Sequence, residues 1–337
     1  MSRITVLGSG AWGTAIALSL ASQQRHQVTL WSHRDEAAEA MRRERENCQY
    51  LPGFPLPESI RVTADRDEAV PEAEILVCVV PSAYLRETMV RLGPWIRPGQ
   101  IVVSTTKGIE ERHHLRMSEL IRRTLSKYGL DLPVGVLSGP SFAQEVAAGM
   151  PTAVTIAFEE IALAERVQTE FSSEALRLYT SDDLIGVELG GALKNVIAIA
   201  AGVLSGLGLG LNSAAGLITR GIAEMTRLAV AAGGRRETLA GLSGLGDLVL
   251  TCTGSLSRNR TVGIELGKGR RLPEILDSLD GKVAEGVRTT RAAMGLARKL
   301  DVEMPITAQM ELILDHGKNP REAIRELMLR PARPETD

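Results

Sequence analysis

The fold is decided by residues 3–23, which read RITVLGSGAWGTAIALSLASQ. A β-branched run at 3–8 leads directly into a glycine-rich turn, and an apolar helical pattern follows at 11–23. A strand, a tight turn and a helix, repeated along a chain, build a parallel sheet that is covered by helices. The stretch therefore predicts an α/β fold that begins at the first residues.

Gly8, Gly10 and Gly13 form a G-x-G-x-x-G pattern at this turn. In this pattern Gly8 permits the tight turn, Gly10 lets the backbone approach a pyrophosphate, and Gly13 allows close packing of helix on strand. The helix N-terminus then offers free N–H groups to the phosphates. The context predicts a dinucleotide-binding domain, and the alternative is a glycine turn in a ligand-free α/β protein.

The alternation of strand-like runs and helical patterns continues to about residue 181. Apolar, β-branched runs occur at 3–8, 27–31, 74–81, 100–105, 134–139 and 152–158, with a candidate seventh at 177–181. Several are apolar throughout, as expected of parallel strands that are covered on both faces. The first half therefore predicts a Rossmann-type doubly wound sheet.

After Ser181 the strand-like runs stop, and helical patterns extend to Leu329 with glycine-rich joints between them. This shift in composition predicts an all-α C-terminal domain. We expect a dinucleotide-binding domain over 1–185, a helical substrate and catalytic domain over 186–330, and a flexible tail over 331–337.

The composition excludes several classes of partner. The chain has 337 residues and a net charge of −2, from 39 basic and 41 acidic residues, so no nucleic-acid partner is indicated. Its three cysteines are far apart, and Cys78 lies in an apolar run as a small buried hydrophobe. Strand-like sequence begins almost at the first residue and leaves no room for a signal peptide. These features favour a cytoplasmic protein.

The apolar window 189–211 is long enough to raise the question of a membrane span, which needs about 20 apolar residues. It carries Lys194 and Asn195 near its start and several glycines after them, so we expect no span. The spacing of Gly202, Gly206 and Gly210 permits a close helix crossing within or between chains, which leaves a homodimer possible.

The second strand ends at Trp31 and is followed by Ser32, His33, Arg34 and Asp35. An NAD-selective site usually places a carboxylate here, on the ribose 2′-hydroxyl. A guanidinium and an imidazole suit a 2′-phosphate instead. The sequence therefore predicts that NADP(H) is accepted; the alternative is that Arg34 is solvated and Asp35 binds NAD(H).

Two further loops follow expected strands. Lys107 lies just past the strand at 100–105, where a ligand of an open α/β sheet binds, and it can meet an anion there. Gly139 and Ser141 lie in a tight turn before a helix and offer donors to a polar substrate. The alternatives are a loop lysine without a role and a turn in which Ser141 caps the helix.

Lys194 is the only charged side chain from Gly190 to Ala201. On a helix its neighbours at three and four residues are mostly small, so other groups can approach it closely. Burial without a partner is costly and lowers the pKa of a lysine towards the range where it can donate and accept a proton. A carboxylate such as Asp247 would oppose that shift and orient the amine.

The run 244–260 is the densest polar cluster of the second half. Asp247 begins an expected helix, and Thr251 lies one turn later on the same face. Ser257, Arg258 and Asn259 are expected in a loop, where the planar guanidinium group of Arg258 suits a phosphate. The alternative is a solvated loop without a ligand.

His113 and His114 lie in ERHHLR (111–116), which is expected to be a solvated helical face without a metal.

Seven blocks occur in order between about residues 3 and 315: GSGAWGTAIA, STTKGIE, LSGPSFAQEVA, ELGGALKNVIAIAAG, GLSGLGDLVLTCT, SRNR and AEGVRT. Together they closely resemble the bacterial-type NAD(P)-dependent glycerol-3-phosphate dehydrogenases. The resemblance implies a Rossmann-type domain, a helical domain with the active site between them, and reversible reduction of dihydroxyacetone phosphate to sn-glycerol 3-phosphate. A role in supplying glycerophospholipid synthesis follows from that reaction.

The resemblance also implies roles for residues. Lys194 is the expected general acid/base, and Lys107, Asn195, Asp247 and Thr251 are expected to line the carbonyl and hydroxyl end. The substrate is expected on Gly139, Ser141, Ser257, Arg258 and Asn259, the last two on its phosphate. The cofactor, NADP(H) or NAD(H), is expected on Gly8, Gly10, Ala11, Trp12, Gly13, His33, Arg34, Tyr50, Lys107, Ala143, Arg258, Val283 and Glu285.

Two departures from the family pattern weaken individual contacts. Ala11 replaces a common serine, and the run VAEG (283–286) makes the register at Val283 uncertain. The alternative hypotheses for the function are another two-domain hydroxyacid dehydrogenase, a non-catalytic NADP-sensing protein, and an integral membrane enzyme.

Overall fold

The apolar runs of the first half pair into one eight-stranded sheet in the computed structural model, which describes residues 1–278, 283–332 and 334–335. Its strands are β1 (Ser2–Leu7), β2 (His26–Trp31), β5 (Ile60–Thr63), β6 (Ile75–Cys78), β7 (Ile101–Ser104), β8 (Val134–Ser138), β9 (Thr152–Ala157) and β10 (Leu176–Ser181). A separate two-stranded hairpin pairs β3 (Glu46–Asn47) with β4 (Leu51–Pro55).

The sheet order is β10-β9-β8-β7-β6-β1-β2-β5. The chain therefore starts in the middle of the sheet and winds outward in both directions, as a doubly wound fold requires. All neighbouring strands are parallel except β8 and β9, which are antiparallel. The Rossmann-type sheet is confirmed, and all seven expected strands are present.

Both faces of the sheet are covered, which explains the uninterrupted apolar runs. In β6, Ile75 and Val77 join the core under α1 (Ala11–Ala21) and α7 (Ile161–Phe171), whereas Leu76 and Cys78 join the core under α4 (Ser82–Leu92) and α5 (Met117–Leu125). Burial raises the pKa of the Cys78 thiol to about 12, so it behaves as the expected small hydrophobe.

Helices of the sheet unit alternate with its strands, and those after β10 form a helical unit. The first group is α1 (Ala11–Ala21), α2 (Asp35–Glu44), α3 (Arg66–Ala69), α4 (Ser82–Leu92), α5 (Met117–Leu125), α6 (Ala143–Ala147) and α7 (Ile161–Phe171). The second is α8 (Leu184–Gly206), α9 (Leu211–Ala231), α10 (Arg236–Leu239), α11 (Asp247–Thr253), α12 (Arg258–Gly267), α13 (Leu272–Asp277), α14 (Glu285–Leu300), α15 (Pro305–His316) and α16 (Pro320–Met328).

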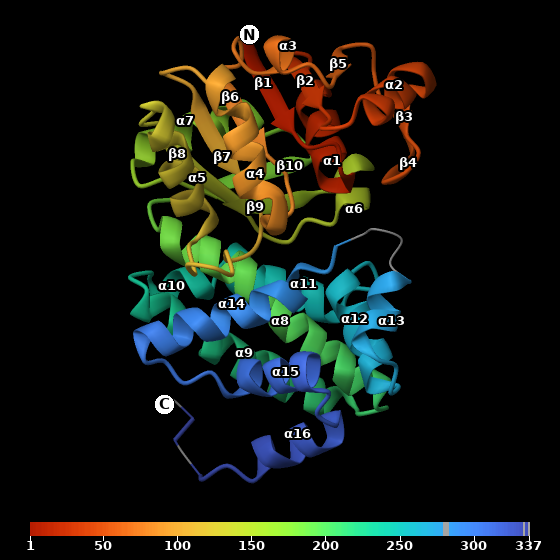
Figure 1. Ribbon diagram of the computed structural model, residues 1–337, viewed down its shortest axis with the longest axis vertical. Helices are drawn as coiled ribbons and strands as arrows, with labels where there is room; N and C mark the ends of the chain where they lie inside the picture. The colour runs from red at the N-terminus through yellow and green to blue at the C-terminus, as the bar shows by residue number, and fades with distance from the viewer. Residues whose placement is uncertain (279–282, 333, 336–337) are drawn as a thin grey trace.

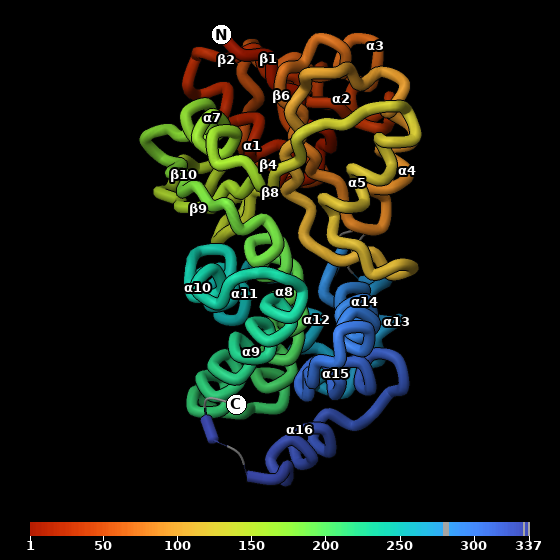
Figure 2. The backbone as a smooth tube through the Cα atoms, turned by 90° about the vertical axis from the view of Figure 1, so that its left-hand side faces the viewer, coloured from red at the N-terminus to blue at the C-terminus, as the bar shows by residue number. Residues whose placement is uncertain are grey.

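Figure 1 shows the two units stacked end to end, with the sheet above and the helices below. Helix α8 runs from the sheet into the helical unit, where α9, α12, α14 and α15 surround it (Figure 2). Among the described residues, no strand follows β10, so the all-α second half is confirmed. The expected tail falls partly on residues outside those described.

Helix α8 is the one continuous helix of the described chain that is long and apolar enough to cross a bilayer; α10–α11 and α12 satisfy the same test only as a bent pair. In α8, 94% of the apolar window is buried inside the protein. Its apolar surface is therefore used by the core of the helical unit.

Helices α8 and α12 cross with their backbones in contact. A Cβ atom on Gly202 would lie 2.1 Å from the Arg260 carbonyl oxygen, and one on Gly263 would lie 1.9 Å from that of Ile199. Gly206 meets Gly267 in the same way. The glycine spacing noted in the sequence therefore serves a crossing within the chain, although Gly210 has open space around it.

Three expectations were wrong in detail. The strands β3, β4 and β5 were missed, in part because prolines and glycine interrupt the run at 51–55. The last sheet strands include the antiparallel pair β8–β9. The segment 111–116 is a turn rather than a helix, because His114 has φ of 58° and its ring lies against Gly295 of α14.

We expect Gly263→Ala to destabilise the protein by at least about 1–3 kcal/mol, because the added methyl group has no space at the crossing. The matched control is Gly216→Ala in α9, where a Cβ meets nothing within 4 Å. That change should stabilise the helix by about 0.5–1 kcal/mol. Denaturant titration measures both, and equal effects would contradict the packing argument.

Candidate active site

The glycine turn has the geometry that its sequence predicts. Gly8 has φ of +120°, and a Cβ there would lie 2.6 Å from the Val79 carbonyl oxygen. A Cβ on Gly13 would lie 1.9 Å from the Gly8 carbonyl oxygen, so α1 packs tightly on the turn. Gly10, by contrast, precedes α1 with open space before it. These features fit a pyrophosphate at the N-terminus of α1.

Asn47 holds this turn in place, and sequence reasoning missed it. Its amide nitrogen donates to the Ser9 carbonyl oxygen (2.8 Å) and to Thr14 Oγ1 (2.7 Å). Its Oδ1 accepts from the Tyr50 backbone N–H at 3.2 Å. The β3–β4 hairpin, which carries the expected cofactor residue Tyr50, is thus tied to the glycine turn.

A small apolar cluster adjoins the start of α1. Ala11 and Trp12, at the first turn of α1, pack with Ala143 of α6 against the buried side chains of Leu51 and Val146. The structure therefore brings three of the expected cofactor residues together at one helix end. His33 and Arg34 lie exposed at the end of β2, where Arg34 precedes α2.

The ammonium group of Lys194 is buried in the helical unit with two polar partners. Its Nζ donates to Asp247 Oδ1 and to Thr251 Oγ1, the latter at 2.7 Å. Thr251 in turn donates to the Asp247 carbonyl oxygen at 2.6 Å, which turns a lone pair towards Lys194. An ammonium has three N–H donors, so one remains for a ligand.

Lys107 shares the same carboxylate. Its Nζ donates to Asp247 Oδ2 at 2.6 Å and to the Gly139 carbonyl oxygen at 3.2 Å. Lys107 comes from the loop after β7, Gly139 follows β8, and Asp247 begins α11. The site is therefore built between the two units, and its two lysines outnumber its one carboxylate, which suits an anion.

Burial lowers the pKa of Lys194 to about 8, and the positive charge of Lys107 acts in the same direction. Asp247 opposes the shift, as the sequence predicted. A lysine with a pKa near neutrality can both give and take a proton.

The small neighbours of Lys194 let other backbone segments approach. A Cβ on Gly190 would lie 2.7 Å from the Ser243 carbonyl oxygen, in the π-helical turn Leu242–Gly246 that leads into α11. A Cβ on Gly191 would lie 2.3 Å from Ser138 Oγ, at the end of β8. The two glycines thus bring α11 and the sheet edge to the lysine.

Asn195 and Asn259 form one buried network. Asn259 Oδ1 accepts from the Gly286 N–H (2.9 Å), and its Nδ2 donates to Asn195 Oδ1 (3.0 Å). This pairing leaves the amide group of Asn195 and one N–H of Asn259 free to donate.

The expectation that Ser257, Arg258 and Asn259 lie in a loop was wrong for two of them. Ser257 caps α12, since its Oγ accepts from the Arg260 N–H at 3.2 Å, and Arg258 and Asn259 form the first turn of the helix. A capping serine is a strong helix start that can outweigh a polar run. The exposed Arg258 side chain is attracted by the carboxylate of Glu285.

Ser141 does not cap α6, whose N-cap is Phe142. Its hydroxyl donates to the Gly139 carbonyl oxygen at 3.0 Å. Gly139 has φ of +150°, and a Cβ there would lie 2.9 Å from Val154 Cα, so the turn is closed by β9. Both residues therefore border the site at the end of β8.

Glu285 connects the two units at the other side of the site. Its carboxylate accepts from the Ser82 backbone N–H (2.9 Å) and hydroxyl (2.5 Å) at the N-terminus of α4. Burial raises the pKa of Glu285, and the Ser82 hydrogen bonds oppose this. Val283, two residues earlier, is half-buried beside the segment 279–282, which lies outside the described residues.

Glu188 of α8 is another carboxylate that connects the two units, and sequence reasoning missed it as it missed Asn47. It is buried and accepts from the Ser118 N–H and hydroxyl, both at 2.7 Å, and from Arg116 at 2.9 Å. These bonds fix the start of α5 against α8. The loop between β7 and α5, which carries Lys107, is thereby held at both ends.

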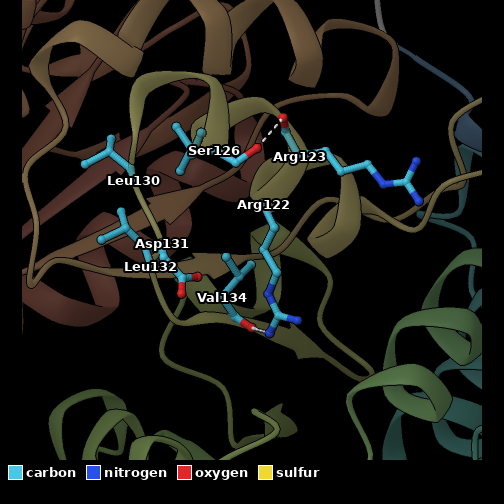
Figure 3. Close-up of a pocket in the computed structure, with 8 residues that line it drawn as sticks. Arg122, Arg123, Ser126, Leu130, Asp131, Leu132 and Val134 are labelled. Atoms are coloured by element: carbon cyan, nitrogen blue, oxygen red, sulfur yellow. Dashed lines mark hydrogen bonds between the residues drawn. The ribbon is translucent and has the colours of Figure 1, made fainter.

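A cavity of about 290 Å³ lies away from these residues, beside α5. Figure 3 shows Arg122 and Val134 at its wall, with Arg123 pointing away. Arg122 is paired with Glu159 at 2.7 Å, and none of the expected site residues lines the cavity. Among the described residues, no group of three His, Cys, Asp or Glu side chains is placed to hold a metal ion.

We expect Asp247→Asn to lower the free energy of unfolding by about 3–5 kcal/mol, because it leaves two ammonium groups without their shared counter-charge. The control is Asp182→Asn, whose ion pair with Arg235 is exposed and should contribute less than about 1 kcal/mol. Denaturant titration compares the variants. Equal stability of the two would show that Asp247 is not a shared counter-ion.

Known proteins resemble this chain over almost its whole length. Models of the NAD-dependent glycerol-3-phosphate dehydrogenase N-terminus and C-terminus match residues 3–164 and 183–325. Glycerol-3-phosphate dehydrogenase [NAD(P)+] of Acidobacterium capsulatum is 60% identical, over 99% of this chain and 100% of that protein, and the Koribacter versatilis enzyme of the same name is 53% identical over 98% of each. The crystal structure of glycerol-3-phosphate dehydrogenase from Coxiella burnetii superimposes with a TM-score of 0.92 at 40% identity, over 98% of this chain and 99% of that one. The chain thus belongs to the NAD-dependent glycerol-3-phosphate dehydrogenase family.

Proposed function

We propose that this protein catalyses the reversible, NAD(P)H-dependent reduction of dihydroxyacetone phosphate to sn-glycerol 3-phosphate. The observation that carries the proposal is the buried Lys194 ammonium, held by Asp247 and Thr251 with one donor left over. Its product is a precursor of glycerophospholipids, so the enzyme would supply phospholipid synthesis in the cytoplasm.

Lys194 is the general acid of the reduction. Negative charge develops on the carbonyl oxygen as the ketone carbon is reduced, and a positioned ammonium stabilises that charge and supplies the proton. Asp247 and Thr251 fix the direction of the remaining N–H. In the reverse reaction the neutral amine accepts the proton from the alcohol.

Lys107 and Asn195 assist at the same oxygen. Lys107 has a free N–H after its bonds to Asp247 and Gly139, and Asn195 has a free amide group. Hydrogen bonds from either group polarise the carbonyl or hold the neighbouring hydroxyl. The surplus of positive charge also favours the phosphorylated substrate over a neutral ketone.

The phosphate end of the substrate binds at the start of α12, on Arg258 and Asn259, with Ser257 as the cap that presents them. Gly139 and Ser141 border the other side. Anchoring the phosphate fixes the three-carbon chain relative to Lys194. The binding energy of the phosphate is thus used to hold the carbonyl group in the orientation that the reaction needs.

The cofactor binds along the sheet edge. Gly8, Gly10, Ala11, Trp12 and Gly13 hold its pyrophosphate; further contacts come from His33, Arg34, Tyr50, Lys107, Ala143, Arg258, Val283 and Glu285. When bound, NAD(P)H supplies the hydride for the ketone carbon.

We place the domain boundary at residues 185/186 and end the helical domain at residue 330. The enzyme works as a monomer or a homodimer.

The pKa of Lys194, about 8 instead of 10.5, sets a pH dependence. The reduction needs the protonated amine, so kcat/KM for dihydroxyacetone phosphate should fall as pH rises above about 8. Oxidation of glycerol 3-phosphate needs the neutral amine and should rise through the same range. Initial rates between pH 6 and 10 at saturating cofactor would measure both.

Lys194→Ala should lower kcat by a factor on the order of 10²–10⁴ and remove this pH dependence. The dissociation constant for NADPH should stay within about threefold, because the amine makes no expected cofactor contact. A variant that retains the wild-type rate and profile would show that another group moves the proton.

Arg258→Met tests the phosphate anchor. It should lower kcat/KM for dihydroxyacetone phosphate by roughly 10–100-fold, because the variant loses the binding energy of one or two charge-assisted hydrogen bonds to the phosphate. Turnover of unphosphorylated dihydroxyacetone, measured at saturating NADPH, should change by less than about threefold. An equal loss with both substrates would mean that Arg258 acts only through its cofactor contact or the fold and does not anchor the substrate phosphate.

A further inference from the structure

The guanidinium group of Arg34 has a neutral partner. Its Nη2 donates to Gln49 Oε1 at 3.0 Å. Among the described residues no carboxylate forms an ion pair with it, although Asp35 and Glu36 are its neighbours in sequence. The Arg34 side chain is therefore exposed, oriented and not neutralised.

Gln49 is held in place by the hairpin on which it lies. On one side Asn47 is bonded to the Ser9 carbonyl oxygen and to Thr14 of α1. On the other side Leu51 is fully buried beneath α1 and α6. Figure 1 shows the hairpin strands β3 and β4 beside α2. The position of Gln49 is thus fixed relative to the glycine turn.

The chemistry of this pair favours a dianion. A guanidinium has five N–H donors, and the single bond to Gln49 leaves most of them available. An amide oxygen orients the group without cancelling its charge, whereas a carboxylate at the same place would form an ion pair.

The charges of Arg34 and Arg91 both act on this corner, as their effect on His33 indicates. Desolvation of its ring lowers the pKa of His33 although part of the side chain is exposed, and the charges of Arg34 and of Arg91 in α4 lower it further, against an opposing effect of Glu87. A ligand group with two negative charges gains more from this potential than a hydroxyl does.

We propose that Gln49 is a positioning residue that determines cofactor specificity, because it holds Arg34 ready for the 2′-phosphate of NADP(H) without neutralising it. The inference rests on the proposed function only in that the glycine turn binds a dinucleotide.

The test is direct binding, measured by the fluorescence of NADPH and of NADH without a second substrate. Gln49→Glu should raise the dissociation constant for NADPH by about tenfold or more, since it replaces a neutral acceptor with a counter-ion. The dissociation constant for NADH should stay within about twofold, and Gln49→Ala should lie between wild type and Gln49→Glu for NADPH. Cys48→Ser, at the adjacent exposed position, is the control for disturbance of the hairpin.

Arg34→Ala separates an effect through the arginine from a direct one. In that background Gln49→Glu should cause no further loss of NADPH selectivity. Equal losses for both cofactors in Gln49→Glu, no loss for either, or an undiminished effect without Arg34 would each overturn the inference. A wild-type protein that binds neither cofactor would overturn the proposed function as well, so the two failures are distinguishable.

Discussion

The buried carboxylate of Asp247 is the interaction on which the site depends. It accepts from Lys194 of α8 with one oxygen and from Lys107 of the sheet unit with the other. Without it, the two ammonium groups that bind its two oxygens would repel each other, and the repulsion is poorly screened because Lys194 is buried. The carboxylate therefore makes a cationic site possible at the joint of two folding units, and it moderates the effect of burial on the Lys194 amine.

The joint itself is made by carboxylates from the helical unit that meet helix starts in the sheet unit. Glu188 binds the first turn of α5, and Glu285 binds the first turn of α4. Each satisfies N–H groups that a helix start leaves without partners and places negative charge at the positive end of the helix. Because Glu188 is buried and Glu285 is half-buried, a sliding movement of one unit on the other would leave both carboxylates without their hydrogen-bond donors. The arrangement explains how Lys107 is held within hydrogen-bond distance of a residue 140 positions away.

Much of this could be predicted from the sequence, for definable reasons. Apolar runs marked every long strand of the sheet, and the isolated charge in α8 together with Asp247 indicated the lysine–carboxylate pair. The residues that were missed, Asn47, Gln49, Glu188 and Ser82, are ordinary polar residues whose partners are distant along the chain, so no local pattern distinguishes them from solvated ones. Asn259 was placed in a loop because the run of polar residues around it is typical of a loop, and Ser257 was not identified as the residue that caps α12. The antiparallel β8–β9 pairing depends on the path of the connection, which strand composition does not encode.

The glycine crossing of α8 and α12 has a consequence for the spacing of the site. Lys194 lies on one of these helices and Arg258 on the other, and the two backbones touch at Gly202 and Gly263 without intervening side chains. The spacing between the proposed proton donor and the proposed phosphate anchor therefore depends on a contact between two main chains rather than on the size of a side chain between them. An exchange of apolar residues elsewhere in the helical unit would leave this main-chain contact in place, whereas any side chain at Gly202 or Gly263 would push the two helices apart.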